Sequence, residues 1–279
     1  MIMRLFYLLF PCLLCAQPYD LLLTNGRIFD GTGKPPYTGA VAIRDGRIVA
    51  AGSVSGPANK TIDVKGMAIA PGFVDVHTHA ENIESHPKAK AFLRMGVTTL
   101  VLGNCGSSRL DLGGYFKKLE AKKFSPNVCS LIGHGTVRKQ AMGKSFMRPP
   151  SKEEMAEMKK LIDLAMRDGA VGMSTGLIYL PGVYAKTEEL IELSKVVQKH
   201  GGLYVSHMRA EGKQIFEAVD EVCRISKEAG LPAHISHLKL NTKPMWGRHL
   251  ELIARLNRAR AEGISLTHDQ YAYTASSTG

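Results

Sequence analysis

The sequence has little cysteine, no low-complexity segment and no basic strip rich in aromatic residues. It contains 5 cysteines in 279 residues, and the three beyond the N-terminal apolar run, Cys105, Cys129 and Cys223, are scattered. An odd number of scattered cysteines excludes a disulfide scaffold. The formal net charge is +11, but Lys and Arg are spread along amphipathic segments without interleaved aromatics. We therefore expect no nucleic-acid partner.

The rest of the composition is that of an ordinary globular protein. Apolar residues make up 44% of the chain and charged residues 22%, which provides ample material for a core. The sequence pI of 9.4 has two interpretations, a solvated basic surface or attraction for a small anionic substrate. Net charge affects solubility and the steering of ligands, and it does not distinguish the two interpretations.

Residues 1–16 have the pattern of a signal peptide. A positively charged residue precedes an apolar run at residues 5–15, which has the length of a signal core and is too short to span a membrane. Cleavage is expected near Ala16, although Leu14 suits neither that cleavage nor lipidation of Cys15. A short membrane anchor is the alternative. We predict an exported protein, periplasmic or secreted, with no membrane span once the signal is removed.

The next region, residues 17–70, is rich in strand patterns. Its short apolar stretches are broken by Asn25-Gly26 and Asp45-Gly46, and such dipeptides favour hairpins. A further strand is expected within residues 61–72. We predict a small sheet domain here.

From residue 71 to 279, strand-like runs alternate with amphipathic helices. The predicted strands are residues 73–79, 97–104, 127–133, 170–175, 203–208, 232–238 and 264–270. The clearest helix lies between a capping box, Ser151 with Glu154, and a terminating Gly169. Alternating strands and helices indicate a parallel sheet. Seven strands in a row favour a TIM-like (β/α) barrel over a doubly wound sheet, with the count one short of eight.

Potential metal ligands stand at the ends of four of these strands. They are His77, His79, Cys105, His207 and His237. The carboxyl ends of barrel strands meet at one rim, so these side chains are expected to cluster. Imidazole nitrogens with one thiolate suit zinc, and three protein ligands leave a position for water. A single strand-end histidine is more often structural, and a free cysteine is more often an inert buried thiol; the combination favours a metal site.

Four other residues of these strands are weaker candidates for the metal site. His134 ends the third strand. His234 lies three residues before His237 and is expected to face away from it. Asp269 belongs to the seventh strand, next to His268, which the pattern does not place.

Several segments resemble the N-acyl-D-amino-acid deacylases (D-aminoacylases) of the amidohydrolase superfamily. In chain order they are PGFVDVHTHAE, GVTTLVLGNCG, LIGHGTVR, GAVGMSTGLIY, YVSHMRAEG, ISHLK and DQYAYTASST. The resemblance extends over residues 19–279. The H-x-H pattern alone is generic to the superfamily, whereas GNCG together with MSTGL and SHLK is much more specific.

The resemblance implies a zinc barrel beside a small β-sandwich, of which the strand-rich region before residue 71 would be a part. The implied ligands are Cys105, His207 and His237 for one tight zinc, and His77 and His79 for a second, weaker metal position.

The resemblance also implies an activity. It would be zinc-dependent hydrolysis of the amide bond of N-acyl-D-amino acids, giving a carboxylate and a D-amino acid from a small anionic substrate. Tyr179, Lys239 and Ser277 match positions that contact substrate. Lys239 lies two residues beyond His237, where an ammonium can meet a carboxylate. A lysine is also often a solvated surface charge, and Tyr179 could pack under a loop.

Two departures from the family matter. Hydantoinase-like relatives use a carboxylated lysine from strand four, but here that strand reads AVGMST. The family's catalytic aspartate lies at the end of strand eight, whereas this chain stops at Gly279, after the seventh strand. We therefore expect a C-terminally truncated chain with an incomplete barrel, no catalytic aspartate and no activity by itself. The alternatives are an inactive metal-binding fragment and another amidohydrolase, such as a dipeptidase or a cyclic amidase; Cys105 and strand four disfavour the cyclic amidase.

Overall fold

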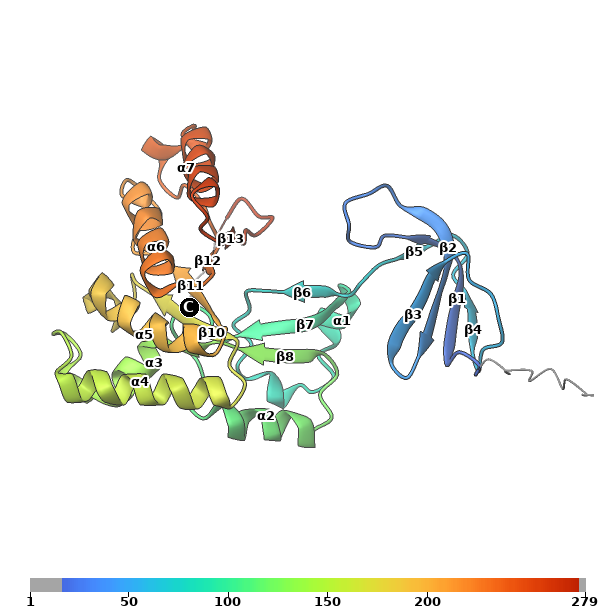
Figure 1. Ribbon diagram of the computed structural model, residues 1–279, viewed down its shortest axis with the longest axis horizontal. Coiled ribbons are helices and arrows are strands. Elements are labelled where there is room, and N and C mark those ends of the chain that lie inside the picture. Colours follow the sequence, from blue (N-terminus) through green and yellow to red (C-terminus); the bar gives the residue numbers. More distant parts are fainter. Residues whose placement is uncertain (1–16, 276–279) are drawn as a thin grey trace, which may run out of the picture. The chain divides into compact units, whose positions relative to one another are not determined.

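The computed structural model describes residues 17–275. The predicted signal peptide, residues 1–16, and Ser277 lie outside the described residues. The chain divides into two compact units, the first ending at Pro71 and the second beginning at Gly72 (Figure 1).

The first unit is a five-stranded mixed sheet with the order β3-β2-β1-β4, in which β5 also pairs with β1. Its strands are β1 (Leu21–Ile28), β2 (Tyr37–Arg44), β3 (Arg47–Gly52), β4 (Thr61–Asp63) and β5 (Ala68–Ile69). The Asp45-Gly46 turn joins β2 to β3, as the sequence predicts. The hairpin expected at Asn25-Gly26 is wrong. Asn25 has a positive φ of 56° inside β1, and the β1–β2 register shifts there, so the pair forms a bulge.

The second unit is built from parallel strands that follow one another in chain order. They are β6 (Phe73–Asp75), β7 (Val97–Leu102), β8 (Asn127–Ser130), β9 (Ile132–Gly133), β10 (Gly172–Gly176), β11 (Leu203–His207), β12 (Ala233–Ile235) and β13 (Leu266–His268). One sheet has the order β6-β7-β8 and the other β13-β12-β11-β10-β9. Only Leu131 separates β8 from β9, so one predicted strand contributes to both sheets.

These sheets make an α/β fold that is consistent with a TIM-like barrel. Among residues 72–275, no hydrogen-bonded ladder joins β6 to β13. Each predicted strand region contains an observed strand, but the strands are shorter than the sequence predicts. The difference matters most at β6, which ends at Asp75. His77 and His79 therefore follow the strand, and Thr78 between them bonds through its N–H and its hydroxyl to the Val101 carbonyl of β7.

Helices alternate with the strands and cover the sheets (Figure 1). They are α1 (Lys90–Arg94), α2 (Leu112–Ala121), α3 (His134–Met142), α4 (Lys152–Arg167), α5 (Thr187–Lys199), α6 (Ile215–Ala229) and α7 (His249–Ala261), with 3₁₀ turns η1 (Ile83–Ser85), η2 (Gly143–Ser145), η3 (Gly182–Tyr184) and η4 (Lys243–Met245). The capping box of Ser151 and Glu154 at the start of α4 is confirmed. In the part of the chain described, no helix has the length and apolar character needed to cross a bilayer.

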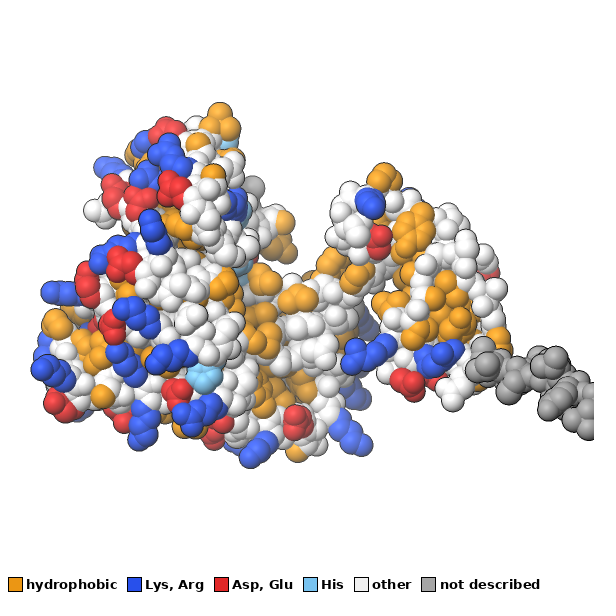
Figure 2. All heavy atoms as spheres, viewed as in Figure 1, with side chains coloured by type: hydrophobic (Ala, Val, Ile, Leu, Met, Phe, Trp, Pro, Cys, Tyr) orange, Lys and Arg blue, Asp and Glu red, His pale blue; other side chains and the backbone are white. Residues whose placement is uncertain are grey.

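The core of the second unit lies between the strands and the helices. It contains fully buried side chains from both, including Ile132, Met173, Tyr204, Val219 and Ile235. The outer faces of the helices carry the charge. Figure 2 shows Lys and Arg interspersed with Asp and Glu over the helices of this unit on the visible face. On that face, the mixed signs fit the solvated-surface interpretation of the basic composition.

Candidate metal centre

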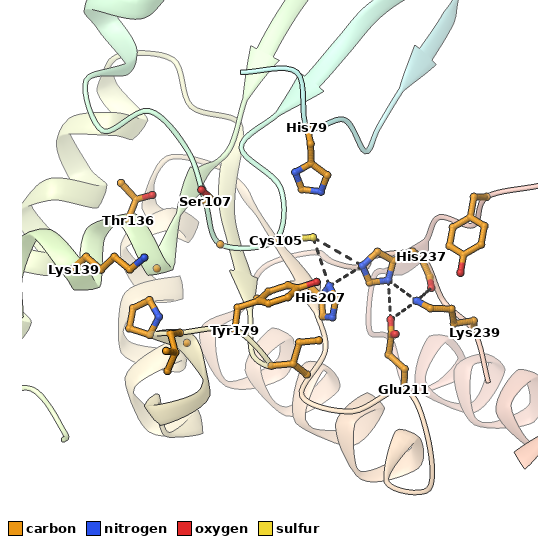
Figure 3. Close-up of a pocket in the computed structure, with 18 residues that line it drawn as sticks. His79, Cys105, Ser107, Thr136, Lys139, Tyr179, His207, Glu211, His237 and Lys239 are labelled. Carbon is orange, nitrogen blue, oxygen red and sulfur yellow. Dashed lines mark hydrogen bonds and ion pairs between the residues drawn. The ribbon is translucent and has the colours of Figure 1, made fainter. Parts of the chain in front are cut away.

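Four potential ligands from four strand ends converge in the second unit. Cys105 follows β7, His207 ends β11, His237 follows β12 and His77 follows β6. The Cys105 Sγ lies 3.4 Å from His77 Nε2, 3.6 Å from His207 Nδ1 and 3.9 Å from His237 Nε2. The ring nitrogens of His207 and His237 are 2.8 Å apart. Three of the four, all but His77, line a cavity of about 710 Å³ (Figure 3).

His79 is at the edge of this cluster. It lines the same cavity, and its ring centroid lies 5.3 Å from that of His77. Within the described residues, the donor groups whose atoms all lie within 4.8 Å of one another are His77–Cys105–His237 and His207–Glu211–His237. His79 is in neither group. Burial, followed by the neighbouring His77, lowers the pKa of His79, which favours a neutral ring.

The loop that carries Cys105 is held against β10. Cys105 has a positive φ of 53°, an uncommon conformation for a residue with a side chain. The Gly106 N–H donates to Ser174 Oγ at 3.0 Å, and that hydroxyl donates to the Gly103 carbonyl at 2.5 Å. A Cβ on Gly176 would lie 2.2 Å from the Cys105 carbonyl oxygen. The small residues of β10 therefore let this strained loop approach closely, and such strain is typical of functional sites.

Asp269 connects three residues of the site. Its Oδ2 lies 3.2 Å from His77 Nδ1 and 2.9 Å from His234 Nε2, and its Oδ1 accepts from the His237 N–H at 2.7 Å. The expectation that His234 faces away is wrong. Opposite facing at a spacing of three requires a continuous strand, but β12 ends at Ile235 and His237 has a positive φ of 37°.

Glu211 makes the corresponding contact to His237. Its Oε1 lies 2.8 Å from His237 Nδ1 and 2.5 Å from Lys239 Nζ. Sequence reasoning gave Glu211 no role and gave Asp269 none beyond membership of a strand. Both follow strand ends, Glu211 four residues after His207 and Asp269 directly after β13. The rule that selected the histidines could have selected these carboxylates too.

The protonation states prepare the cluster to accept a cation. Burial alone would raise the pKa of Asp269, but hydrogen bonds from His234 and His77 outweigh it and hold that pKa well below its usual value. Glu211 behaves in the same way: burial would raise its pKa, but hydrogen bonds from His237 and Lys239 lower it. An ionised carboxylate only accepts hydrogen bonds, so the Nδ1 atoms of His77 and His237 must donate. Their Nε2 atoms face Cys105.

The pKa values of Cys105 and His207 fit the same conclusion. Burial, with the charges of Asp269 and Glu211, raises the pKa of the Cys105 thiol to about 12. Burial, followed by His237, lowers the pKa of His207 to about 4, so its imidazole is neutral. A neutral imidazole is the ligand form of histidine, and a bound metal would replace the proton of this thiol, which would leave to solvent.

The donor set fits zinc. Zinc–ligand distances of ~2.0–2.3 Å in a tetrahedral site place ligand atoms roughly 3.3–3.6 Å apart. The contacts of Cys105 to His77 and His207 fall in that range, at 3.4 and 3.6 Å, whereas His237 lies 3.9 Å from Cys105 and 2.8 Å from His207. Metal-binding histidines usually donate their second nitrogen to a carboxylate, and His77 and His237 both do so.

Two of the three residues expected to contact substrate lie on the cavity walls, and the third, Ser277, is outside the described residues. Tyr179 and Lys239 both line the cavity, and the Tyr179 ring stands edge-on to His207 at 4.8 Å. Apolar side chains close one wall, namely Ile178, Leu180 and Pro181. His134, by contrast, is fully buried away from the cluster, and its Nε2 bonds to Glu189 at 2.8 Å.

These features define an α/β protein of parallel strands with a thiol–imidazole cluster at the strand ends. The chain belongs to the amidohydrolase family, which it matches over residues 60–268. The predicted family is thereby confirmed.

Within this family, the chain is similar to deacylases of N-acyl-D-amino acids. The chain is 38% identical to the D-aminoacylase of Alcaligenes xylosoxydans xylosoxydans over 94% of its own length, and 36% identical to the N-acyl-D-glutamate deacylase of that organism over 94%. It spans 59% and 58% of the length of these relatives.

Solved structures of the same kinds of enzyme are also similar to this chain. A crystal structure of D-aminoacylase superposes with a TM-score of 0.87 at 34% identity, covering 92% of this chain and 59% of that one. The N-acyl-D-glutamate deacylase of Bordetella bronchiseptica, complexed with zinc and a phosphonate inhibitor, gives 0.85 at 34% identity with the same two coverages. An L-hydantoinase of Arthrobacter aurescens, at 18% identity and a TM-score of 0.64, shares the fold alone.

Proposed function

We propose that the protein hydrolyses N-acyl-D-amino acids at a zinc centre, giving a carboxylate and a D-amino acid. The observation that carries the proposal is the convergence of one thiol and three imidazoles from four strand ends beside a cavity. The relatives support the reaction class, because those with 34–38% identity are named D-aminoacylase and N-acyl-D-glutamate, or D-aspartate, deacylase. The parallel strands β6 to β13 would belong to a TIM-like barrel.

The ligand roles follow from the contacts. Cys105, His207 and His237 would hold the tight zinc, and His77 with His79 would line a second, weaker position. Bound zinc supplies Lewis-acid activation of water and of the acyl carbonyl. Asp269 and Glu211 do not need to touch substrate. Each holds one imidazole with its Nε2 lone pair aimed at the cluster, so both are positioning residues.

The cavity walls would bind and orient the substrate. The apolar side chains of Ile178 and Leu180 can exclude water from one side of the bound amide, and Tyr179 would pack over it beside His207. Lys239 would meet the substrate carboxylate. Its ammonium is shared with Glu211 at 2.5 Å, so substrate binds there against an existing ion pair. We therefore expect Lys239 to orient the carboxylate more than to attract it.

A stereochemical panel tests the proposal. The protein, purified from its complete natural gene and loaded with zinc, is assayed with the N-acetyl derivatives of D- and L-leucine, D- and L-methionine, and D- and L-glutamate. Release of free amine is measured. We expect turnover of D forms, L forms slower by a factor of about 100 or more, and loss of turnover with a chelator that zinc reverses.

The control is His86→Ala, because His86 is exposed beside η1 and lies outside the cluster. It should keep full zinc and full activity. Equal turnover of L forms, or turnover of cyclic amides in place of N-acyl-D-amino acids, would contradict the proposal. Stable zinc binding without hydrolysis of any amide would favour a non-catalytic metal protein.

A further inference from the structure

Helix α3 presents two different faces. His134, Val137 and Arg138 are fully buried on one face. Gly135, Thr136 and Lys139 lie on the other face and line the cavity that holds the metal cluster. The cavity-facing spacing of three and four residues is that of helix neighbours. The segment that follows β9 therefore contributes a cation to the cavity wall.

The ammonium of Lys139 points into the cavity. A long side chain on a helix runs back toward the helix N-terminus, so this side chain extends past Gly135 and Thr136. Figure 3 shows it directed inward, on the far side of Tyr179 from His237 and Lys239. The cavity therefore has a lysine on each side of the metal cluster.

The two lysines differ in their partners. Lys239 is paired with Glu211 at 2.5 Å and also donates to the His237 carbonyl at 2.9 Å. For the Lys139 ammonium, no ion pair or hydrogen bond occurs among residues 17–275. Glu211 is the carboxylate that lines the cavity, and it is already paired with His237 and Lys239. Lys139 thus supplies a cationic charge that no described acidic residue offsets.

The helix is fixed relative to the metal cluster. The Thr136 N–H donates to the Gly106 carbonyl at 3.2 Å, and Thr136 Oγ1 accepts from the Ser108 N–H at 3.0 Å. These bonds tie α3 to the loop that carries Cys105. On the buried face, Arg138 and His134 tie α3 to Glu189 of α5. The base of Lys139 therefore stays at a constant distance from the cluster, which makes it able to select ligand length as well as charge.

We propose that Lys139 forms a second anion subsite, so that the preferred substrates carry two carboxylates. The first is the α-carboxylate of an N-acyl-D-amino acid, and the second meets the Lys139 ammonium across the cavity. This inference rests on the proposed function and names the substrate class. The second carboxylate has two possible sources, an acidic side chain or a dicarboxylic acyl group, and both offer the same chemistry to one ammonium.

The test separates charge from shape. Zinc-loaded protein from the complete gene is assayed with two matched pairs, N-acetyl-D-glutamate against N-acetyl-D-glutamine and N-succinyl-D-leucine against N-butyryl-D-leucine. The variants are Lys139→Met, which removes the charge, and Lys139→Arg, which keeps it. Lys144→Met, in η2, removes an exposed lysine close in the chain and is the control.

The expected result is a preference for one dianionic member that falls about tenfold in Lys139→Met. A charged hydrogen bond is worth about 10- to 100-fold, reduced here because the lysine is exposed. The loss should appear in KM more than in kcat, Lys139→Arg should restore most of it, and Lys144→Met should leave it unchanged. The pair that responds identifies the source of the second carboxylate.

Three outcomes would overturn the subsite. They are a change below about twofold for both pairs, an equal loss for charged and neutral members, and an effect of Lys144→Met as large as that of Lys139→Met. Turnover of N-butyryl-D-leucine without charge preference would leave the proposed function standing and remove this inference. If no compound is hydrolysed, the proposed function fails. Titration calorimetry with N-acetyl-D-glutamate and N-acetyl-D-glutamine then tests the subsite by binding alone. Equal affinities in wild type and Lys139→Met would reject the Lys139 subsite.

Discussion

Two of the histidine–carboxylate clusters among the described residues of the second unit lie away from the surface, and one of these two has the form of a reactive site. In the metal cluster, Glu211 holds His237 at 2.8 Å; in the other, Glu189 holds His134 at the same distance. The contacts alone do not distinguish them. Both clusters leave a buried ring nitrogen without a partner, and the difference is whether the cluster faces a cavity.

The cluster of His134, Arg138 and Glu189 is closed to solvent and to the cavity, although His134 Nδ1 and Arg138 Nε are buried without a hydrogen-bond partner. One Glu189 oxygen bonds to His134 and the other to the Arg138 guanidinium, and all three side chains are buried. Burial alone would raise the pKa of Glu189, but His134 and Arg138 outweigh it and keep that pKa below its usual value. This cluster joins α3 to α5 and faces no cavity. In the metal cluster, ring nitrogens and a thiol converge beside a cavity. The candidate functional site is therefore distinguished by the cavity that its ligand atoms face.

The largest effect is expected from breaking the closed cluster. Arg138→Met leaves Glu189 buried with a single partner, and removing one member of a buried ion pair costs about 3–5 kcal/mol of unfolding free energy. Urea denaturation of the purified protein measures that cost, and elemental analysis of the folded fraction should still find zinc. Arg224→Met is the matched control, because Arg224 contacts Glu188, the neighbour of Glu189, at the exposed surface. Equal losses in both variants would contradict the contrast.

Cys105→Ala is expected to give the reverse pattern. It removes the only sulfur of the metal cluster and should weaken zinc binding by more than about 100-fold, since even residues that only orient ligands contribute about 10- to 100-fold. The metal-free protein should unfold at an unchanged urea concentration. Zinc is measured by competition with a chromogenic chelator. Cys129→Ala, a half-buried thiol in β8, is the control, and full zinc in Cys105→Ala would reject the ligand assignment.

This contrast also shows which parts of the fold and of the site could be predicted from the sequence. Strand positions and the family were predictable, because hydrophobic runs, capping residues and motif order are local in the chain. The strand ends were less predictable: His77 follows β6 instead of lying in it, because the chain bends at Val76 and His77 before Thr78 bonds to β7. His134 and His237 both follow apolar runs, and nothing in the sequence tells which one meets an arginine and which one meets a thiol.

The positioning carboxylates could not be assigned from sequence for a related reason. Asp269 contacts His77 across 192 positions of the chain. Such a contact depends on how the first and the last described strands of the unit are brought together, which periodicity does not encode. Glu211 is near His207 in the chain, but its contact is with His237. Burial and pairing, known only in three dimensions, separate these two carboxylates from the acidic residues of the surface.

A smaller effect is expected from Asp269→Asn. The amide keeps the size of the side chain but no longer forces His77 to donate from Nδ1, so the Nε2 lone pair is less well directed at the cluster. We expect zinc affinity at the position held by His77 to fall about 10- to 100-fold, measured by the same chelator competition. Asp163→Asn is the control, because Asp163 contacts His200 at 2.8 Å at the surface. Unchanged affinity in Asp269→Asn would show that the orientation of His77 does not depend on this carboxylate.

The smallest effect is expected at the exposed ion pair between α4 and α5. Lys159 lies 2.7 Å from Glu192, one turn along α5 from the buried Glu189, and the two side chains are 36% and 43% exposed. Hydrogen bonds from Lys159 and then Lys195 lower the pKa of Glu192 to about 2. A depressed carboxyl pKa adds stability above its ordinary value near 4.5, and this stability is lost as the pH falls toward 2. Water screens an exposed pair, so the contribution is at most about 0.2–1 kcal/mol.

Lys159→Met should therefore lower the unfolding free energy at pH 7 by about 0.2–1 kcal/mol, and the difference from wild type should shrink at pH 3.5. Urea titrations at the two pH values measure it. Lys160→Met, beside it on α4, removes the same charge without contacting α5. A loss comparable to that of Arg138→Met would mean that charge pairing to α5 stabilises the unit whether or not it is buried. The closed cluster would then differ from the surface pairs only in position, and burial could no longer explain why Glu189 stabilises the fold while Glu211 holds a candidate metal ligand.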